Sequence, residues 1–334
     1  MSSKNNDNIR EIVKFFCKYC FKLNLGIILC FVINTPSWGQ FDAQITQYMH
    51  NKTIVNPAAV GEQQMMQIFG LQRLQWISIE NAPKTTYFSA HAPFSIKKTA
   101  HGGGIQFVND EFGLFSNQQI NLQYAYKLKL GKGKLSIGAN IGVSNITFKG
   151  GDSVHLVVSD YFSPAQDPII PDNTVSGIGF DCGIGIYYST DIWYAGISAL
   201  HLPESTMELG DVGEFYMKRL YTASGGYNLK LRNPDYTIKT SALVITDFIS
   251  WNPSLSALLD YKDKYWGGIS GRLDAISFML GIKVLNGLSI GYSYDLPVTK
   301  IITASHGSHE LFLAYEFSLA LDKKNKKYKS IRIL

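Results

Sequence analysis

The seven histidines of this 334-residue chain are its first candidates for metal binding or acid–base chemistry. They are scattered, and none has the His-Glu-x-x-His spacing that places two imidazoles on one helical face. His306 and His309 are three positions apart, but on an extended segment that spacing points their side chains to opposite faces. We therefore expect no metal site.

Serine and glycine motifs give no support for catalysis or cofactor binding. In the stretch Gly307-Ser308-His309, the serine and the histidine are adjacent, and adjacent strand residues face apart. The chain contains no Gly-x-Ser-x-Gly nucleophile elbow. The three glycines at 102–104 lack the Lys-Ser/Thr that follows a phosphate-binding loop. We expect a non-enzymatic protein with no catalytic residue and no cofactor.

The N-terminal 39 residues have the layout of a secretory signal peptide. Basic residues at positions 10, 14, 18 and 22 precede an apolar run over 23–33. That run is shorter than the roughly 20 residues that a membrane-spanning helix needs. Small Ser37 and Gly39 follow, at the positions that a signal peptidase reads. We expect cleavage after Gly39, and an uncleaved anchor is the alternative.

Cysteine placement and charge exclude further classes of partner. Three of the four cysteines lie in the expected signal, which leaves Cys182 alone in the mature chain, without a disulfide or a cysteine metal site. Cys182 lies on the apolar side of an alternating strand, where we expect a small hydrophobe facing lipid. The formal charge of +5 collects at the two ends of the chain and therefore predicts no nucleic-acid partner.

The elements that must position all other residues are long strands with alternating side chains. In the stretch 121–130, apolar Leu122, Tyr124 and Leu128 alternate with polar or basic neighbours, and 135–144 repeats the pattern. Successive strand residues point to opposite faces, so each strand has one apolar and one polar or small face. A soluble β-sandwich also alternates, but its strands average about five or six residues. The longer segments favour a membrane barrel.

The sequence predicts a transmembrane antiparallel β-barrel of about 14 strands, an even number as in bacterial barrels. We expect an N-terminal lead-in or plug segment over 40–64, the barrel over 65–320 and a basic tail over 321–334. The candidate strands are 66–79, 85–94, 103–110, 114–130, 134–149, 177–189, 192–202, 218–231, 235–248, 254–262, 265–273, 275–285, 288–295 and 310–319.

The connections and the charged residues of these strands suggest two rims and a braced lumen. Tight turns are expected at 131–133, 190–191, 233–234, 263 and 286–287, and long loops at 149–176 and 203–217, as on the two rims of an outer-membrane barrel. Aromatic residues near strand ends are candidates for the membrane-interface girdle: Trp76, Tyr187, Tyr188, Trp193, Tyr194, Trp251, Tyr265 and Trp266. Inward carboxylates need lumen partners, which arginines could supply: Asp181, Asp260, Asp274 and Asp295 with Arg73, Arg219 and Arg272.

Four stretches carry a resemblance to a known family. They are 47–61, with Gln47-Tyr48-Met49 and Asn56-Pro57-Ala58-Ala59; 73–85, with Arg73 and Trp76; Gly291-Tyr292-Ser293-Tyr294-Asp295; and Gly307-Ser308-His309-Glu310. With these motifs the sequence resembles the PorP/SprF family of outer-membrane proteins associated with type IX secretion and gliding motility in Bacteroidetes. The resemblance covers nearly all of the mature chain. Two departures are a missing tyrosine beside Asn56 and the basic tail after Phe317.

The resemblance implies a barrel in the cell outer membrane that works by binding proteins. Some members resemble core components that connect to periplasmic ring lipoproteins, and others pair with one secreted cargo, often a large adhesin, through its C-terminal signal domain. Outer-membrane lipids would surround the barrel. A passive porin or a hydrophobic-solute transporter is the alternative, because polar inner faces and long loops would serve it equally well.

The last hairpin, 291–319, carries the two most specific motifs. We expect Tyr292 and Tyr294 on the apolar side of their strand, with Ser293 and Asp295 facing the lumen. The pairing of the two strands should then bring His309 and Glu310 close enough for a polar contact with Asp295 or Ser293. Such a motif would either fix the closure of the barrel or take part directly in binding a partner.

Overall fold

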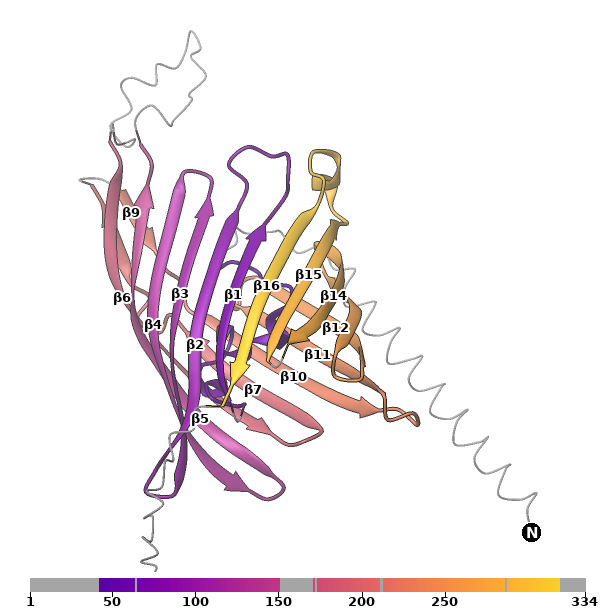
Figure 1. Ribbon diagram of the computed structural model, residues 1–334. Helices are drawn as coiled ribbons and strands as arrows, with labels where there is room; N and C mark the ends of the chain where they lie inside the picture. Colours follow the sequence, from indigo (N-terminus) through magenta and orange to yellow (C-terminus); the bar gives the residue numbers. More distant parts are fainter. Residues whose placement is uncertain are drawn as a thin grey trace, which may run out of the picture. The chain divides into compact units, whose positions relative to one another are not determined.

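The computed structural model describes residues 42–63, 65–150, 171, 173–210, 213–285 and 287–318. The expected signal sequence and the basic tail lie outside these residues. Fourteen antiparallel strands form a closed barrel in the order β1-β16-β15-β14-β13-β12-β11-β10-β7-β6-β5-β4-β3-β2, and β8 and β9 form a separate two-stranded sheet (Figure 1). The predicted fold class and strand number are confirmed. No helix among the described residues is long and apolar enough to cross a membrane.

The strands are longest on one side of the barrel, from β2 to β6. The strand bounds are β1 Met66–Leu74, β2 Lys84–Ile96, β3 Thr99–Phe112, β4 Phe115–Leu130, β5 Gly133–Phe148, β6 Val175–Ser189, β7 Trp193–Leu200, β8 Thr206–Leu209, β9 Gly213–Tyr216, β10 Leu220–Lys230, β11 Tyr236–Thr246, β12 Trp251–Tyr261, β13 Tyr265–Arg272, β14 Ala275–Leu285, β15 Leu288–Pro297 and β16 Ser308–Phe317. Closure comes from β1 and β16, which pair from Met66↔Phe317 to Leu74↔His309.

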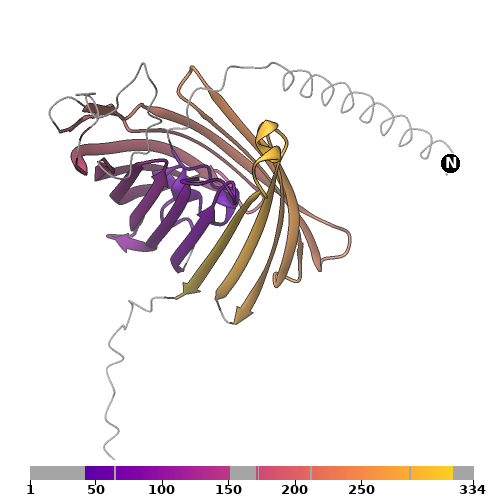
Figure 2. The ribbon, with the colours of Figure 1, turned by 90° about the horizontal axis from the view of Figure 1, so that it is seen from above.

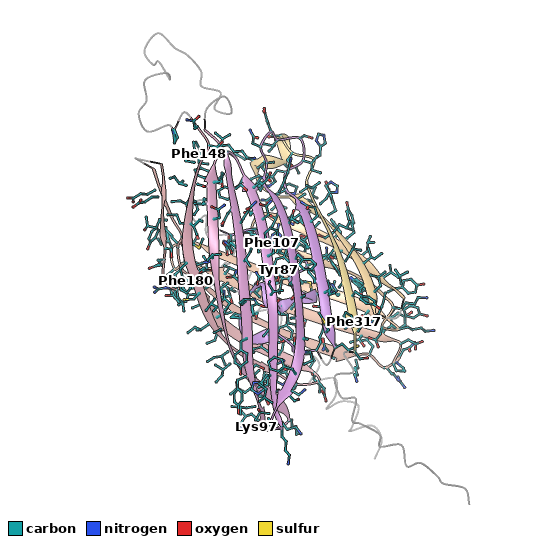
Figure 3. The ribbon with its side chains drawn as sticks, turned by 60° about the vertical axis from the view of Figure 1, so that its left-hand side comes forward. Tyr87, Lys97, Phe107, Phe148, Phe180 and Phe317 are labelled. Atoms are coloured by element: carbon teal, nitrogen blue, oxygen red, sulfur yellow. The ribbon has the colours of Figure 1, made fainter. Side chains whose placement is uncertain are left out.

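Alternation places apolar side chains outside and polar ones inside. In β4, Ile120, Leu122 and Tyr124 are 47–55% exposed, whereas Asn121 and Gln123 between them are buried. This is the reverse of a soluble protein, in which the apolar face is the covered one. Outward side chains such as Phe180 can be followed in Figure 3. A wall with this arrangement satisfies its backbone within the sheet and presents hydrocarbon to lipid.

All fourteen predicted barrel strands are present, but their ends differ by a few residues. The largest difference is in β1, which ends at Leu74 instead of Ile79, because Trp76 and Ser78 adopt left-handed backbone conformations with φ of 49° and 84°. The predicted loop at 203–217 contains the short hairpin of β8 and β9. These four-residue strands lie below the length that an alternating pattern can reveal.

Alternate connections of an antiparallel barrel fall on the same rim. The predicted tight turns, together with the turn at 97–98, all join strands at one rim, where β1 begins and β16 ends. The other rim carries the connections 75–83, 113–114, 149–174, 201–219, 247–250, 273–274 and 298–307, of which only some are long. Short turns face the periplasm in bacterial barrels, so we call the first rim periplasmic and the second extracellular.

Three aromatic residues assigned from the sequence to the membrane girdle point into the lumen instead. Tyr187 is 1% exposed and packs with Ala58 and Ala59. Tyr194 packs partly buried against the same cluster, and Trp266 packs against Phe312. Their positions near strand ends are correct, but the register turns these side chains inward. Among the remaining candidates, Trp193, Trp251 and Tyr265 are exposed on the outer face.

The described N-terminal segment, 42–63, runs through the lumen as three turns of 3-10 helix, Tyr48–His50, Lys52–Ile54 and Pro57–Ala59. In Figure 2 these short indigo turns lie inside the ring of strands. Glycines of the wall give the segment room. A Cβ on Gly138 of β5 would lie 2.5 Å from the Cα of Ala58, and one on Gly102 of β3 would meet the carbonyl oxygen of Val60.

This close approach predicts that Gly138→Leu displaces the segment. The new side chain would collide with backbone atoms of Ala58, which cannot rotate away. We expect trypsin to cleave after Lys52 in the variant but not in the native barrel, with the products identified by mass spectrometry. The matched control is Gly271→Leu, since a Cβ on Gly271 meets nothing within 4 Å. If Gly138→Leu and native protein resisted trypsin equally, the close contact of Ala58 with Gly138 would be contradicted.

Candidate functional site

The site centres on Arg73, the penultimate residue of β1 at the extracellular end of the wall. Its side chain is 1% exposed. One guanidinium nitrogen, Nη2, lies 2.7 Å from Oδ2 of Asp295 in β15, and Nη1 lies 3.1 Å from Oε2 of Glu310 in β16. The register places Arg73 directly opposite Glu310. Three neighbouring strands therefore meet in one buried ionic cluster.

The same two carboxylates hold the N-terminal segment. The backbone N–H groups of Thr46 and Gln47 donate to the two oxygens of Glu310, at 2.9 and 2.8 Å. The hydroxyl of Thr46 donates to Oδ2 of Asp295 at 2.8 Å and accepts from Nη1 of Arg73 at 3.0 Å. Charged hydrogen bonds of this kind are stronger than neutral ones. The cluster thus joins wall and segment.

A second arginine extends the cluster along the wall to β13. Arg272, at the end of β13, places Nη2 3.1 Å from Oδ2 of Asp295 and Nε 3.1 Å from Oδ1 of Asp274. It also donates to the Thr46 hydroxyl at 2.7 Å. The lumen partners that the sequence suggested for Asp295 and Asp274 are therefore arginines. Asp295 is bound by Arg73 and Arg272, each two strands away in the wall, and Asp274 is bound by Arg272, two residues before it in the chain.

The predicted polar contact of Glu310 with Asp295 or Ser293 is not made directly. Ser293 pairs with Glu310 in the ladder and is fully buried, but it is Arg73 that bridges Glu310 to Asp295. His309 points outward instead, where its Nδ1 lies 2.6 Å from the Tyr292 hydroxyl. Residues 309 and 310 face apart because they are adjacent in a strand.

At the rim above the cluster, the loop after β1 is hydrogen-bonded to the start of β16. The N–H of Trp76 donates to the Ser308 hydroxyl at 3.1 Å, and the N–H of Ile77 donates to the carbonyl of Gly307 at 2.9 Å. Gly307 has a φ of 91°, which favours glycine. Tyr294 donates to the carbonyl of His306 at 3.1 Å. Most of the motif residues thus gather around the closing seam of β1 and β16.

Asn56 and Pro57 lie apart from this seam, deep in the lumen against β6 and β7. Pro57 opens the third 3-10 turn, and Oδ1 of Asn56 accepts from the N–H of Ala58 at 2.9 Å. The amide nitrogen of Asn56 donates to the carbonyls of Ile186 and Ile197, each at 3.1 Å. Asn56 therefore caps its own turn and clamps the segment to two wall strands.

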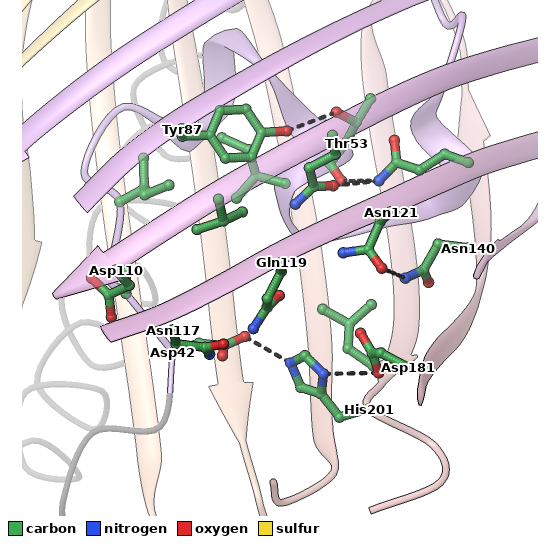
Figure 4. Close-up of a pocket in the computed structure, with 17 residues that line it drawn as sticks. Asp42, Thr53, Tyr87, Asp110, Asn117, Gln119, Asn121, Asn140, Asp181 and His201 are labelled. Carbon is green, nitrogen blue, oxygen red and sulfur yellow. Dashed lines mark hydrogen bonds and ion pairs between the residues drawn. The ribbon is translucent and has the colours of Figure 1, made fainter. Parts of the chain in front are cut away.

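A histidine that sequence reasoning did not single out anchors the start of the described chain. His201, one residue beyond β7, places Nε2 3.0 Å from Asp42 and Nδ1 3.0 Å from Asp181 (Figure 4). Burial alone would lower the pKa of His201, but the two carboxylates raise it to about 10. The same ion pair lowers the pKa of Asp42 against the opposing effect of burial. A cavity of about 60 Å³ lies beside these residues.

Lys52 and Glu62 form a further clamp near the periplasmic end of the segment. Their side chains are paired at 3.0 Å, and the Tyr187 hydroxyl donates to Glu62 at 2.6 Å. The Lys52 ammonium also lies 3.9 Å from the ring centre of Tyr194. The inward turn of these two tyrosines, which the sequence did not reveal, completes the clamp.

The ion pairs and hydrogen bonds of this site hold the N-terminal segment to the barrel wall. The charges of the site are paired with one another and with backbone groups of the segment. No group of three or more His, Cys, Asp or Glu side chains in the described part of the chain could hold a metal ion.

The ionic cluster predicts a large effect of Arg73→Met on stability. Removing the guanidinium leaves two buried carboxylates short of their partner, which lowers the unfolding free energy by ~3–5 kcal/mol. Urea unfolding from lipid vesicles measures this change. In the control Lys262→Met, which breaks the exposed pair of Lys262 and Asp235, the change should be much smaller, because an ion pair in solvent contributes little. A loss no larger than the control's would refute the central role of Arg73.

The His201 cluster predicts a pH dependence. Because the folded pKa of His201 is raised to about 10, its contribution to stability is complete below a pH of about 6.5 and is lost as the pH rises through about 10. The loss should be on the order of a few kcal/mol. Native protein should lose more stability than His201→Asn between pH 7 and 10.5 in urea unfolding. Parallel curves for the two proteins would disprove the charged state.

Comparison with known proteins places the chain in a family. No curated protein matches it. Among solved structures, it is similar to the CymD monoaromatic hydrocarbon channel (11% identity, TM-score 0.49, covering 84% of this chain and 95% of that one). It is also similar to the Pseudomonas putida toluene transporter TodX (11%, 0.46, 84% and 96%) and the KdgM porin (8%, 0.35, 75% and 99%). At these identities and TM-scores, the similarity does not extend to what those proteins transport.

The sequence model described as "Type IX secretion system membrane protein PorP/SprF" matches residues 38–315, which includes all the described barrel strands except the last two residues of β16. This match bears out the resemblance that the four motif stretches carry. The chain belongs to the PorP/SprF family of type IX secretion system membrane proteins.

Proposed function

We propose that this outer-membrane barrel has no enzymatic role and serves type IX secretion by binding proteins, with its own N-terminal segment occupying the lumen. The observation that carries the proposal is the fastening of that segment to the wall through Arg73, Asp295 and Glu310. A barrel that serves as an open pore has no need to bury the four charged side chains of Arg73, Arg272, Asp295 and Glu310 in order to hold a segment of chain in its path.

Contacts from all around the wall support this proposal. Besides Glu310 of β16, the segment is bonded to several other strands: Ser89 of β2, Gln123 of β4, Ser198 of β7 and Thr222 of β10. Its apolar residues pack against the wall too, with Tyr48 and Val55 in contact with Leu243 of β11. A segment held from so many directions crosses the lumen instead of lining one side of it.

The binding partners belong at the two rims. At the periplasmic rim we place contacts with the secretion machinery, including its ring lipoproteins. At the extracellular rim, where the longer connections lie, we place a secreted cargo held through its type IX C-terminal signal domain. The signal peptide 1–39 would direct the chain to the outer membrane.

A passive pore is the second candidate, favoured by one observation. A cavity of about 550 Å³ lies among polar and charged lumen residues, including Lys52, Lys239, Asp260 and Glu316. Liposome swelling separates the two functions. We expect native protein to exclude small sugars and a variant lacking residues 42–62 to admit them, because the deletion empties the lumen. Free passage of sugars through native protein would favour the porin.

The secretion role has its own test. Cells that lack this protein should fail to export or attach at least one type IX cargo, as measured by surface labelling and by analysis of the medium. Restoring the native gene should restore attachment. The role is wrong if every type IX cargo remains exported and attached in the deletion strain.

A further inference from the structure

Among the described residues, the barrel wall has a strand edge without a partner strand at its extracellular end. β6 runs from Val175 to Ser189, but its ladder with β7 covers only 184–189, and the bond from the Leu202 N–H to the Cys182 carbonyl is the last rung. On its other side, β6 is paired with β5 all the way to Val175. Within the part of the chain that the structure describes, about half of β6 therefore has a strand neighbour on one side only.

No described strand pairs with this edge, because the hairpin that follows β7 leaves the wall. The backbone turns inward at His201 and Glu204, which have φ of 54° and 50°. β8 then packs over the inner face of β6 instead of beside it. A Cβ on Gly177 would lie 2.4 Å from the carbonyl oxygen of Glu208, and one on Gly179 would lie 3.0 Å from Met207. Figure 1 shows this sheet at the upper end of β6.

An apolar cluster keeps the hairpin in that inward position. Met207 and Leu209 of β8 and Met217 after β9 are buried against Ile146 of β5, with Phe148 and other aromatic residues around them. The lumen side of the edge is thereby covered. A strand that joins the edge must come from outside the barrel.

The backbone groups of this edge are set for a strand partner. Because the Cys182 carbonyl faces β7, the backbone groups of Phe180, Ile178 and Ser176 face the same way. The Phe180 carbonyl accepts from the Ser205 hydroxyl at 2.5 Å. Within the described chain, the N–H of Phe180 and both groups of Ile178 and Ser176 have no backbone partner across this edge.

The side chains at the edge are unusually open. Ile178 is 75% exposed, more than any other large hydrophobic residue described, and Phe180 is 56% exposed. These two residues lie at the upper end of the outward apolar row of β6. Hydrocarbon offers no hydrogen-bond partner, so an open edge beside it is unfavourable. A strand with apolar side chains would satisfy the backbone groups of this edge and cover Ile178 and Phe180.

We propose that the β6 edge, residues 176–182, binds an extended segment of a secreted cargo protein by strand addition. The proposal rests on the proposed function and names the contact that would hold the cargo. An added strand would continue the β6–β7 ladder past Cys182, using the free backbone groups for affinity. Its outward side chains would pack on Ile178 and Phe180, as cross-strand pairs do.

Ile178→Pro tests the edge directly. Proline removes the N–H that faces the open edge but spares the ladder with β5, which uses the groups of Gly177 and Gly179. Ile178→Val is the matched control, since it keeps the N–H and an apolar side chain. The faster migration of unheated barrel than of heated, unfolded barrel on denaturing gels verifies that both variants are folded.

The binding measurement uses full-length barrel in detergent and the C-terminal signal domains of the type IX cargo proteins of the same organism, each as a fluorescent fusion. We expect at least one domain to bind, Ile178→Pro to bind it about tenfold more weakly and Ile178→Val to bind it like native protein. Equal binding by Ile178→Pro overturns the edge proposal and leaves cargo binding intact. If no domain binds native barrel, cargo binding itself fails, and the edge proposal fails with it.

Amide hydrogen exchange distinguishes strand addition from side-chain docking. The N–H groups of Ile178 and Phe180 should exchange quickly in the free barrel and slowly in the complex, whereas the Gly179 N–H should be protected in both. Protection of Ile178 and Phe180 already in the free barrel would mean that the chain covers its own edge, which would refute the proposal. Unchanged fast exchange in the complex would refute it too.

Discussion

The burial of Arg73 between Asp295 and Glu310 is the interaction on which the rest of the structure depends. It lies where β1, β15 and β16 meet, so it fastens the seam that closes the barrel. The same carboxylates bind the backbone of Thr46 and Gln47. Taking charges out of water is unfavourable unless every one is paired. Closure of the wall and seating of the N-terminal segment are therefore coupled.

The barrel wall imposes the second constraint. An outer face that meets lipid must be apolar, so the polar and charged residues of an alternating strand can only face the lumen. Left empty, those inward groups would be satisfied by water. Here the N-terminal segment supplies part of the hydrogen bonds that these inward groups need. Asn56, for example, donates to backbone carbonyls of β6 and β7. Small wall residues such as Gly138 let its backbone approach.

The two ends of the barrel differ because the strands differ in length. On the periplasmic rim, tight turns connect the strands, and the ladder is continuous. On the extracellular rim, β6 rises past the last rung with β7, while the hairpin of β8 and β9 folds inward. Because this hairpin folds inward over the lumen, it does not pair with the upper part of β6 in the wall. In a protein of a secretion system, such an edge could bind an extended segment of a secreted protein by strand addition.

The sequence by itself determined the barrel, because alternation is a local property that every residue of a strand reports. Fourteen strands, the five tight turns on one rim and the pairing of Asp295 with arginines could all be read from it. Only the tertiary structure decided that Arg73 bridges Glu310 to Asp295, that Tyr187 and Tyr194 turn inward, and that His201 lies between Asp42 and Asp181. These contacts join residues far apart in the chain, and they depend on register and on the inward kink at His201, to which no local pattern is sensitive.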